Sequence, residues 1–286
     1  PIGSRGLGDV YKRQWLNISM SQVITIICPN RKFYSRAVAI SKRVNAGHIL
    51  VEDVNTESSS FYSLQVDEDG VSLIESNLAS HGPVKVDFVN GSIGHRRRYG
   101  GGNGQAIAKA VGVSGVFLPS ILDLTAGLGT DGFILASLGC DVELVERNPI
   151  IYCLLEDGIR RAIDSAATDK VLMEIIRRLN LTENESIDFL SKLSEAKRAD
   201  VIYLDPMFPR RQKAAKVKKE MQAFQSIVGD DPDADALLAR AMNVAKYRVV
   251  VKRPNHARFL GQLKPTYSLK GKSTRFDIYV NRAIPK

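Results

Sequence analysis

The sequence predicts an α/β fold with a doubly wound, mostly parallel sheet, preceded by a small N-terminal α/β appendage. Two observations favour this fold class. From Gln105 onward, apolar strand-like runs alternate with stretches of helical periodicity, which is typical of a parallel sheet covered by helices on both faces. The run that begins at Ile121 then ends in an acid and a glycine-rich turn before the next helix, an arrangement that places a ligand beyond the strand end.

The chain has 286 residues, of which 44% are hydrophobic and 25% charged, and this suits one large domain with a smaller one. We expect residues 1–19 to be a non-native leader, because the stretch up to Gln14 mixes glycines and charges without periodicity. Met20 is then the expected natural start. Residues 20–90 are expected to form the small subdomain, and residues 91–286 the larger domain.

The small subdomain is predicted to contain strands and one helix. Val23–Cys28 is an apolar strand-like run, and Lys32–Val44 carries apolar residues at helical spacing. A hairpin is expected between Phe61–Val66 and Val71–Ile74, because an Asp-Glu-Asp-Gly turn separates them. Val84–Val89 is expected to be a further strand.

In the larger domain, predicted strands and helices alternate. The expected strands are Ile121–Leu124, Val142–Val145, Val201–Leu204, Arg248–Val251, Tyr267–Lys270 and Phe276–Val280. The expected helices are Gln105–Val111, Asp131–Leu138, Ile150–Ile163, Thr168–Leu179, Lys213–Ile227 and Asp233–Lys246. In such a fold the ligand site lies beyond the carboxyl ends of the strands.

The loop after the first strand of this domain has the features of a cofactor site. Gly127 and Gly129 allow positive φ and a close approach of the backbone to a ligand. The free amides where the following helix begins favour a carboxylate or a phosphate. Glu146 closes the next strand, 19 residues beyond Gly127, and an acid at that place accepts hydrogen bonds from both hydroxyls of a ribose.

Two cofactors fit this loop, S-adenosylmethionine and a dinucleotide. Gly127, Gly129 and Gly132 match the spacing of the dinucleotide fingerprint, so a dinucleotide-dependent oxidoreductase stays an alternative. However, Asp123 would crowd a pyrophosphate, whereas it suits the ammonium group of S-adenosylmethionine. The sequence therefore favours S-adenosylmethionine.

The segment Tyr203–Pro209, Tyr-Leu-Asp-Pro-Met-Phe-Pro, ends a predicted strand at Asp205. It resembles the Asp/Asn-Pro-Pro-Phe/Tyr signature of amino-group methyltransferases, except that Met207 replaces the second proline. A base amine is a poor nucleophile because its lone pair is delocalised into the ring. Hydrogen bonds to the Asp205 carboxylate and the Pro206 carbonyl would hold the nitrogen, and Phe208 would stack on the base, a contact worth about 1–3 kcal/mol. If Asp205 lies elsewhere, a non-enzymatic RNA-binding protein stays possible.

The charge distribution indicates a nucleic-acid partner. The net charge is +9, and the segment Asn243–Lys286 carries 11 Lys or Arg residues against one acid, Asp277. Two further basic clusters flank the predicted site, and localised basicity is typical of phosphate-backbone binding. The predicted RNA-binding residues are His95, Arg96, Arg97, Arg98, Arg210, Arg211, Lys213, Lys218, Lys219, Lys252 and Arg253.

Other features exclude several protein classes. No run of about 18 apolar residues is present, so no transmembrane helix is expected, and no signal peptide is recognised. The three cysteines are widely spaced and odd in number, and the four histidines form no metal-ligand pattern. We therefore expect a protein of the reducing cytoplasm that uses neither a metal nor a membrane.

Taken together, these residues resemble the RsmJ family of bacterial small-subunit ribosomal RNA guanine-N2 methyltransferases over most of Val84–Val280. The matching blocks are Val86–Gly91, His95–Gly102, Asp123–Gly129, Glu146–Pro149, Asp205–Pro209, Lys218–Met221, Phe224–Ser226, Val251–Pro254 and Arg275–Tyr279. Met207 is the family's own choice at its position.

The resemblance implies a Rossmann-like class I S-adenosylmethionine-dependent methyltransferase fold. It implies methyl transfer to N2 of a guanine in 16S ribosomal RNA, although the Asp-Pro-Met-Phe motif by itself does not distinguish guanine from adenine. It also implies a set of cofactor-binding residues, in which the pair Glu185-Ser186 borders the adenine ring within a strand-like segment. These residues are Thr130, Asp131, Glu146, Arg147, Glu185, Ser186 and Asp205.

Overall fold

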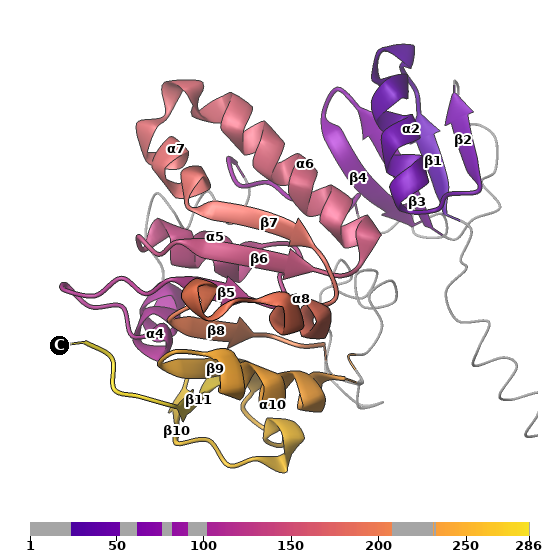
Figure 1. Cartoon of the computed structure of the whole chain (residues 1–286). Helices are drawn as coiled ribbons and strands as arrows, with labels where there is room; N and C mark the ends of the chain where they lie inside the picture. The colour runs from indigo at the N-terminus through magenta and orange to yellow at the C-terminus, as the bar shows by residue number, and fades with distance from the viewer. Residues whose placement is uncertain are drawn as a thin grey trace, which may run out of the picture. The chain divides into compact units, whose positions relative to one another are not determined.

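A computed structural model describes residues 24–51, 62–75, 82–90, 102–207, 231 and 233–285. The chain divides into two compact units, Pro1–Pro83 and Val84–Lys286 (Figure 1). Residues 84–90, which the sequence pattern assigned to the small subdomain, therefore belong to the larger unit. The expected leader, residues 1–19, lies outside the described residues.

The first unit contains a four-stranded sheet and one α-helix among its described residues. The strands are β1 (Thr25–Cys28), β2 (His48–Val51), β3 (Tyr62–Asp67) and β4 (Gly70–Glu75), in the order β2-β1-β3-β4. The predicted hairpin is confirmed as the antiparallel pair β3–β4, whereas β1 runs parallel to both its neighbours. A short 3-10 helix, η1 (Arg31–Phe33), leads into α2 (Tyr34–Arg43), and α2 corresponds to the predicted helix Lys32–Val44. Strand β2 was not predicted.

The second unit is built on a seven-stranded sheet with the order β10-β11-β9-β8-β5-β6-β7. Its strands are β5 (Ile121–Asp123), β6 (Val142–Glu146), β7 (Leu179–Glu183), β8 (Val201–Leu204), β9 (Arg248–Pro254), β10 (Tyr267–Lys270) and β11 (Thr274–Val280). Strands β5 to β9 are parallel, and β11 is antiparallel to both β9 and β10. The chain order reverses at β5, which pairs with β6 on one side and β8 on the other.

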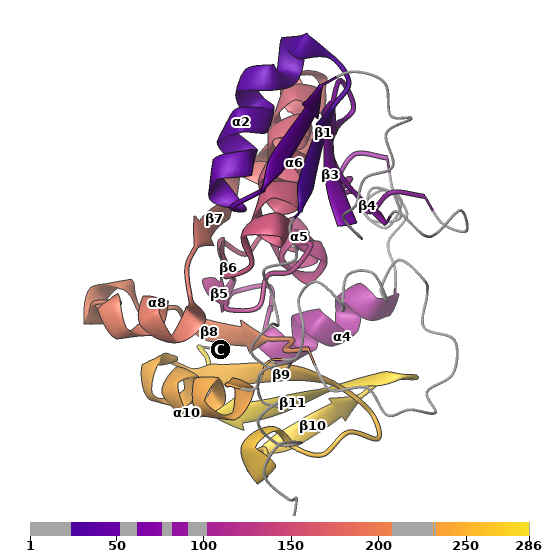
Figure 2. The ribbon, with the colours of Figure 1, turned by 90° about the vertical axis from the view of Figure 1, so that its right-hand side faces the viewer.

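Helices cover both faces of this sheet (Figure 2). On one side lie α4 (Gly102–Val111), α5 (Thr130–Ser137), α6 (Pro149–Ser165) and α7 (Lys170–Arg177). On the other side lie α8 (Ser186–Lys192) and α10 (Ala234–Val244), which pack together. The described residues of this unit also contain three 3-10 turns: η2 (Ala166–Thr168), η3 (Glu195–Lys197) and η4 (Leu260–Gln262). The doubly wound prediction is confirmed, while the predicted helix Lys213–Ile227 lies outside the described residues.

None of the helices in the described ranges is long and apolar enough to cross a membrane.

Local sequence explains where α6, the longest helix of the described residues, begins. The Asn148 side chain accepts hydrogen bonds from the amides of Ile150 and Ile151, at 3.0 and 3.3 Å, and Pro149 takes the first helical position. An Asn cap followed by proline is a strong helix start, because both satisfy or remove amides that have no partner within the helix.

The predicted strand Val84–Val89 is wrong. Val84 forms an isolated bridge, and the chain then bends, because the Asp87 carboxylate accepts hydrogen bonds from the amides of Val89 and Asn90 at 2.8 and 2.9 Å. Such an Asx turn withdraws the backbone from a strand ladder. The segment packs on helices instead: Phe88 stacks on Phe133 of α5 with ring centroids 4.7 Å apart.

This packing predicts that Gly158→Ala in α6 destabilises the protein. A Cβ at Gly158 would lie 2.4 Å from Val86 Cγ1 and 2.7 Å from Val86 Cβ. Helix propensity favours alanine by about 1 kcal/mol, but overpacking costs about 1–3 kcal/mol, so we expect a net loss of about 1 kcal/mol. Urea unfolding of both variants measures it, with Gly115→Ala as control, because no atom lies within 4 Å of a Cβ there. Equal midpoints for the two variants would contradict the packing.

Candidate active site

A cavity of about 260 Å³ lies in the second unit, at the carboxyl ends of β5, β6 and β8. This is the edge where the chain order reverses, and ligands of open α/β sheets bind there. Its lining is Asp123, Leu124, Thr125, Ala126, Gly127, Leu128, Thr130, Asp131, Val145, Glu146, Arg147, Ser186, Tyr203, Asp205, Pro206, Met207, Asp231, Asp233, Ala234, Leu237 and Lys252. Most predicted cofactor residues are therefore gathered in one place.

The glycine-rich loop connects β5 to α5, as predicted. Gly127 and Gly129 have φ values of 54° and 72°, which are in the left-handed region that favours glycine. Gly129 also leaves no room for a side chain, since a Cβ would lie 2.5 Å from Leu155 Cδ1. Because Gly129 is the residue before α5, the first-turn amides at Thr130 and Asp131 begin the helix at the cavity wall, where an anion is favoured.

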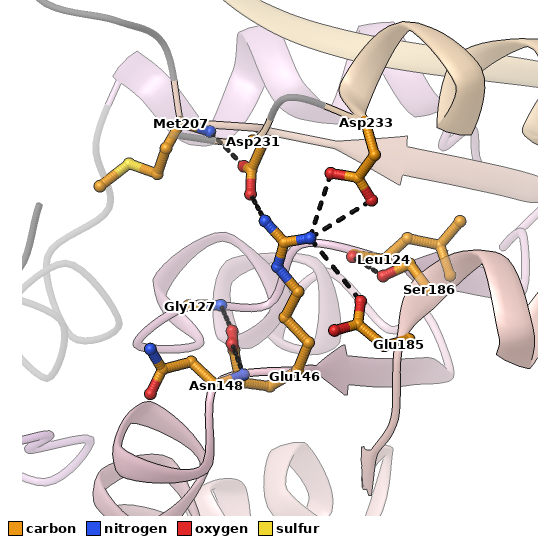
Figure 3. Close-up of polar contacts among 10 residues, drawn as sticks. Leu124, Gly127, Glu146, Asn148, Glu185, Ser186, Met207, Asp231 and Asp233 are labelled. Carbon is orange, nitrogen blue, oxygen red and sulfur yellow. Dashed lines mark hydrogen bonds and ion pairs between the residues drawn. The ribbon is translucent and has the colours of Figure 1, made fainter. Parts of the chain in front are cut away.

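Two buried carboxylates hold the loop in place. Asp123, which is 2% exposed, accepts a hydrogen bond from the Thr125 amide at 3.0 Å, and burial raises the pKa of Asp123 to about 8. Glu146, which is 7% exposed, accepts from the amides of Gly127 and Asn148, both at 2.8 Å (Figure 3). Burial raises the pKa of Glu146 to about 7. Glu146 thus fastens the glycine-rich loop to the end of β6.

Asp205 lies just beyond β8 and faces the same loop. Its amide donates to Thr125 Oγ1 at 2.6 Å, and its carboxylate lies 2.9 Å from the ammonium of Lys252. Lys252 also binds Asp131 at 2.6 Å, and Asp131 accepts from the Tyr203 hydroxyl at 2.7 Å. Burial raises the pKa of Asp205, and the Lys252 ammonium opposes that shift. The ion pair therefore favours the charged form of both partners.

A second cation, Arg147, is surrounded by acids, and Figure 3 labels Asp231, Asp233 and Glu185 among them. Its guanidinium binds Asp231, reaches Asp233 at 3.1 and 3.3 Å, and lies 3.6 Å from Glu185. Asp231 in turn accepts a hydrogen bond from the Met207 amide at 2.6 Å, and its own amide donates to the Met207 carbonyl at 3.4 Å. Arg147 and Asp231 therefore connect the end of β6 to the Asp-Pro-Met segment after β8.

Asp231 and Asp233 were not among the predicted site residues. The sequence offers only a faint signal for them, namely acids around the start of the predicted helix Asp233–Lys246, which the helix dipole would explain equally well. The bonds to Met207 and Arg147 depend on the meeting of segments that are distant in sequence.

The structure places Glu185 and Ser186 differently from the expected strand-like segment. Strand β7 ends at Glu183, Glu185 is the residue before α8 and Ser186 is the first residue of that helix, because the chain turns where the sheet ends. Ser186 lines the cavity and donates from Oγ to the Leu124 carbonyl at 2.6 Å, so it ties α8 to β5.

The structure also separates the two predicted RNA-binding residues of β9. Lys252 lines the cavity and is paired with Asp131 and Asp205. Arg253 is 5% exposed and donates to the Arg258 carbonyl. A buried guanidinium does not reach a phosphate backbone, so the basis for Arg253 as an RNA contact is lost. The remaining predicted RNA-binding and catalytic residues lie outside the described residues. They are His95, Arg96, Arg97, Arg98, Phe208, Arg210, Arg211, Lys213, Lys218 and Lys219.

Comparison with known proteins relates most of the chain to one group. A family model described as putative SAM-dependent methyltransferase matches residues 49–281. The protein named ribosomal RNA small subunit methyltransferase J from Cellvibrio japonicus is 45% identical over 92% of this chain and 98% of its own length. The protein of the same name from Pseudomonas fluorescens is 52% identical over 78% of this chain and 84% of its own.

A solved structure gives the same answer. The crystal structure of a SAM-dependent methyltransferase from Neisseria gonorrhoeae matches with a TM-score of 0.66 at 33% identity, covering 91% of this chain and 97% of that one. A dinucleotide-dependent oxidoreductase and a non-enzymatic RNA-binding protein find no support. The sheet also differs from the dinucleotide-binding order, because β11 is antiparallel and inserted between β9 and β10. The chain belongs to the ribosomal RNA small subunit methyltransferase J family of SAM-dependent methyltransferases.

Proposed function

We propose that this protein transfers a methyl group from S-adenosylmethionine to the exocyclic N2 amine of a guanine in small-subunit ribosomal RNA, in the cytoplasm. The observation that carries the proposal is Asp205, which lies at the end of β8, beside the glycine-rich loop and in contact with Lys252. The names of the relatives support ribosomal RNA as the substrate. The choice of guanine N2 rests on the family resemblance.

The chemistry of the cavity fits S-adenosylmethionine. Asp123 offers a buried carboxylate to the ammonium of the amino-acid end, and the first-turn amides of α5 suit its carboxylate. Glu146 already accepts two backbone amides, and each carboxylate oxygen has a further lone pair for a ribose hydroxyl. Ser186, at the start of α8, borders the place we assign to the adenine. When bound, the cofactor supplies an electrophilic methyl group on a positively charged sulfur.

The residues after β8 hold the acceptor amine in this proposal. Lys252 engages Oδ2 of Asp205, and Oδ1 of the same carboxylate accepts from the guanine amine. The Pro206 carbonyl accepts the second amine hydrogen. These two bonds direct the nitrogen lone pair, and the carboxylate stabilises the positive charge that develops on nitrogen during transfer. A duplex would bury this amine in a base pair, so the target base must be unpaired or turned outward.

The first prediction from this proposal concerns Asp205. In a bacterial strain lacking the gene, expression of the parent protein should restore N2-methylguanosine to ribosomal RNA, and expression of Asp205→Ala should not. Asp205→Asn keeps one acceptor and should restore part of the N2-methylguanosine. Affinity for S-adenosylhomocysteine should stay within about tenfold in both variants, which corresponds to about 1.4 kcal/mol.

Asp188→Ala, on the exposed side of α8, is the matched control and should complement fully. If the parent protein restores a methylated nucleoside other than N2-methylguanosine, the acceptor assignment is wrong. If Asp205→Ala restores normal methylation, the catalytic assignment is wrong while the acceptor stands.

The second prediction concerns Glu146. Glu146→Ala removes the proposed ribose acceptor and should weaken S-adenosylhomocysteine binding by about 2 kcal/mol, a typical value for a charged hydrogen bond. Because the pKa of Glu146 is about 7, the parent protein should lose affinity as the pH falls below that value and the carboxylate is protonated. Calorimetry across this range measures both effects. Glu143→Ala, on the same strand but bonded to Thr182, should bind normally, and parent-like affinity of Glu146→Ala would remove the ribose assignment.

The third prediction concerns Asp231, which we propose to be a positioning residue for the Asp-Pro-Met segment. Asp231→Ala removes the acceptor for the Met207 amide and should lower kcat about 100-fold, because small displacements at a reacting centre are that costly. The S-adenosylhomocysteine affinity should change little. Asp231→Asn keeps an acceptor and should recover part of kcat. Asp233→Ala is the control, since Asp233 contacts Arg147 without bonding Met207, and an equal loss of kcat in both alanine variants would argue against positioning.

A further inference from the structure

The structure divides the basic C-terminal segment, Asn243–Lys286, into residues with different surroundings. Arg248, Arg253 and Arg275 are between 4% and 6% exposed, and Lys252 lines the cavity. These four cations are built into the fold or the site. The remaining exposed cations are therefore the ones that can meet a partner at the surface.

Five exposed cations among the described residues of this segment lie at two opposite edges of the sheet. Lys246 precedes β9 and binds Asp200 at 3.1 Å, and the Arg282 amide donates to the Tyr247 carbonyl after β11, so both mark the amino edge. Arg258 follows β9, Lys270 ends β10, and Lys272 lies in the turn between β10 and β11. Because Thr274 pairs with Pro254 at the end of β9, these three lie at the carboxyl edge, where the cavity opens.

Hydrogen bonds join the two turns of this carboxyl edge into one ridge. Asn255 donates from Nδ2 to the carbonyls of Gly271 and Lys272, at 2.9 and 3.2 Å, and from its amide to the Ser273 carbonyl at 3.1 Å. The ridge is also tied to α10, because the Gly261 amide donates to Asp235 at 2.6 Å. Helix α10 carries cavity-lining residues in its first turns, so the ridge adjoins the cavity wall.

Phe259 is an exposed aromatic residue on this ridge. It keeps 38% of its surface exposed, and the guanidinium carbon of Arg275 lies 5.0 Å from its ring centroid. Arg275 is fixed in turn: it binds Asp277 at 2.8 Å and donates to the Pro254 and Asn255 carbonyls at 3.0 and 2.7 Å. A buried, rigid cation therefore supports the ring, which leaves exposed surface for another planar group.

We propose that Phe259, supported by Arg275, stacks on an unpaired RNA base next to the target guanine, while Arg258, Lys270 and Lys272 contact the adjoining phosphates. Aromatic rings between cations are the usual platform for single-stranded nucleic acid, because every base has a face to stack and every linkage carries a negative charge. Residues from Asn243 to Lys286 include one acid, Asp277, and it is fully buried. The exposed acid that contacts the ridge is Asp235 of α10, whose carboxylate accepts from the Gly261 amide. This inference rests on the proposed function for the identity of the polymer.

The test measures binding of a short unstructured RNA by fluorescence anisotropy at several salt concentrations, with the full chain loaded with S-adenosylhomocysteine. Phe259→Ala should weaken binding about tenfold, as lost stacking predicts, with an unchanged salt slope. Phe259→Trp should restore it. Lys270→Gln combined with Lys272→Gln should reduce the salt slope by about 1.4, the loss of two phosphate contacts.

The matched control is Lys246→Gln combined with Arg282→Gln, which removes the same charge from the opposite edge and should leave the slope nearly unchanged. Calorimetry with S-adenosylhomocysteine should give parent-like affinity for every variant, which excludes unfolding as the cause. Parent-like RNA binding by Phe259→Ala, or equal slopes for the two double variants, would overturn the proposal, as would tighter binding of polyglutamate than of RNA. If the ridge behaves as expected but no N2-methylguanosine forms in cells, the acceptor assignment fails and the ridge stands.

Discussion

The reversal of chain order at β5 is the constraint on which the site depends. Neighbours β6 and β8 run parallel to β5, but their connections leave it in opposite directions, so the loops at its carboxyl end diverge and a cavity remains between them. Buried polar bonds keep these loops apart in a fixed arrangement: Glu146 binds Gly127 across the β5–β6 gap, and Thr125 binds the Asp205 amide across the β5–β8 gap. Without that reversal, these side chains would not face one another.

Electrostatics give the cavity and the rim opposite characters. Six acids line the cavity, and two cations, Lys252 and Arg147, hold several of its carboxylates in place. Such an interior suits a cofactor that carries a sulfonium and an ammonium. The exposed cations gather instead on the ridge after β9 and between β10 and β11, where a phosphate backbone can lie. Because negative charge lines the cavity and positive charge lies on the ridge, one edge of the sheet can accept a cationic cofactor and a polyanionic substrate.

Several residues acquire a different place once the fold is known. Lys252 and Arg253 are adjacent and both basic, yet the alternation of a strand sends one into the cavity and the other into the packed interior. The backbone around Asp87 also differs from what the local sequence pattern predicts. The apolar pattern around it predicts a strand, but its carboxylate bonds two nearby amides and turns the chain, and a helix face rather than a sheet takes up the apolar side chains.

The sequence by itself determined the strand–loop–helix around Gly127 and Gly129, the alternation of strands and helices, the acid that closes β6 and the Asp-Pro-Met segment after β8. Those features are local, because periodicity, glycine and proline act within a few residues. Tertiary structure decided the pairing of Lys252 with Asp205, the bond from Asp231 to the Met207 amide, and the ring of Phe259 over Arg275. Each of these joins segments that the sheet brings together across an edge, and no local pattern carries information about which distant carboxylate or guanidinium will lie there.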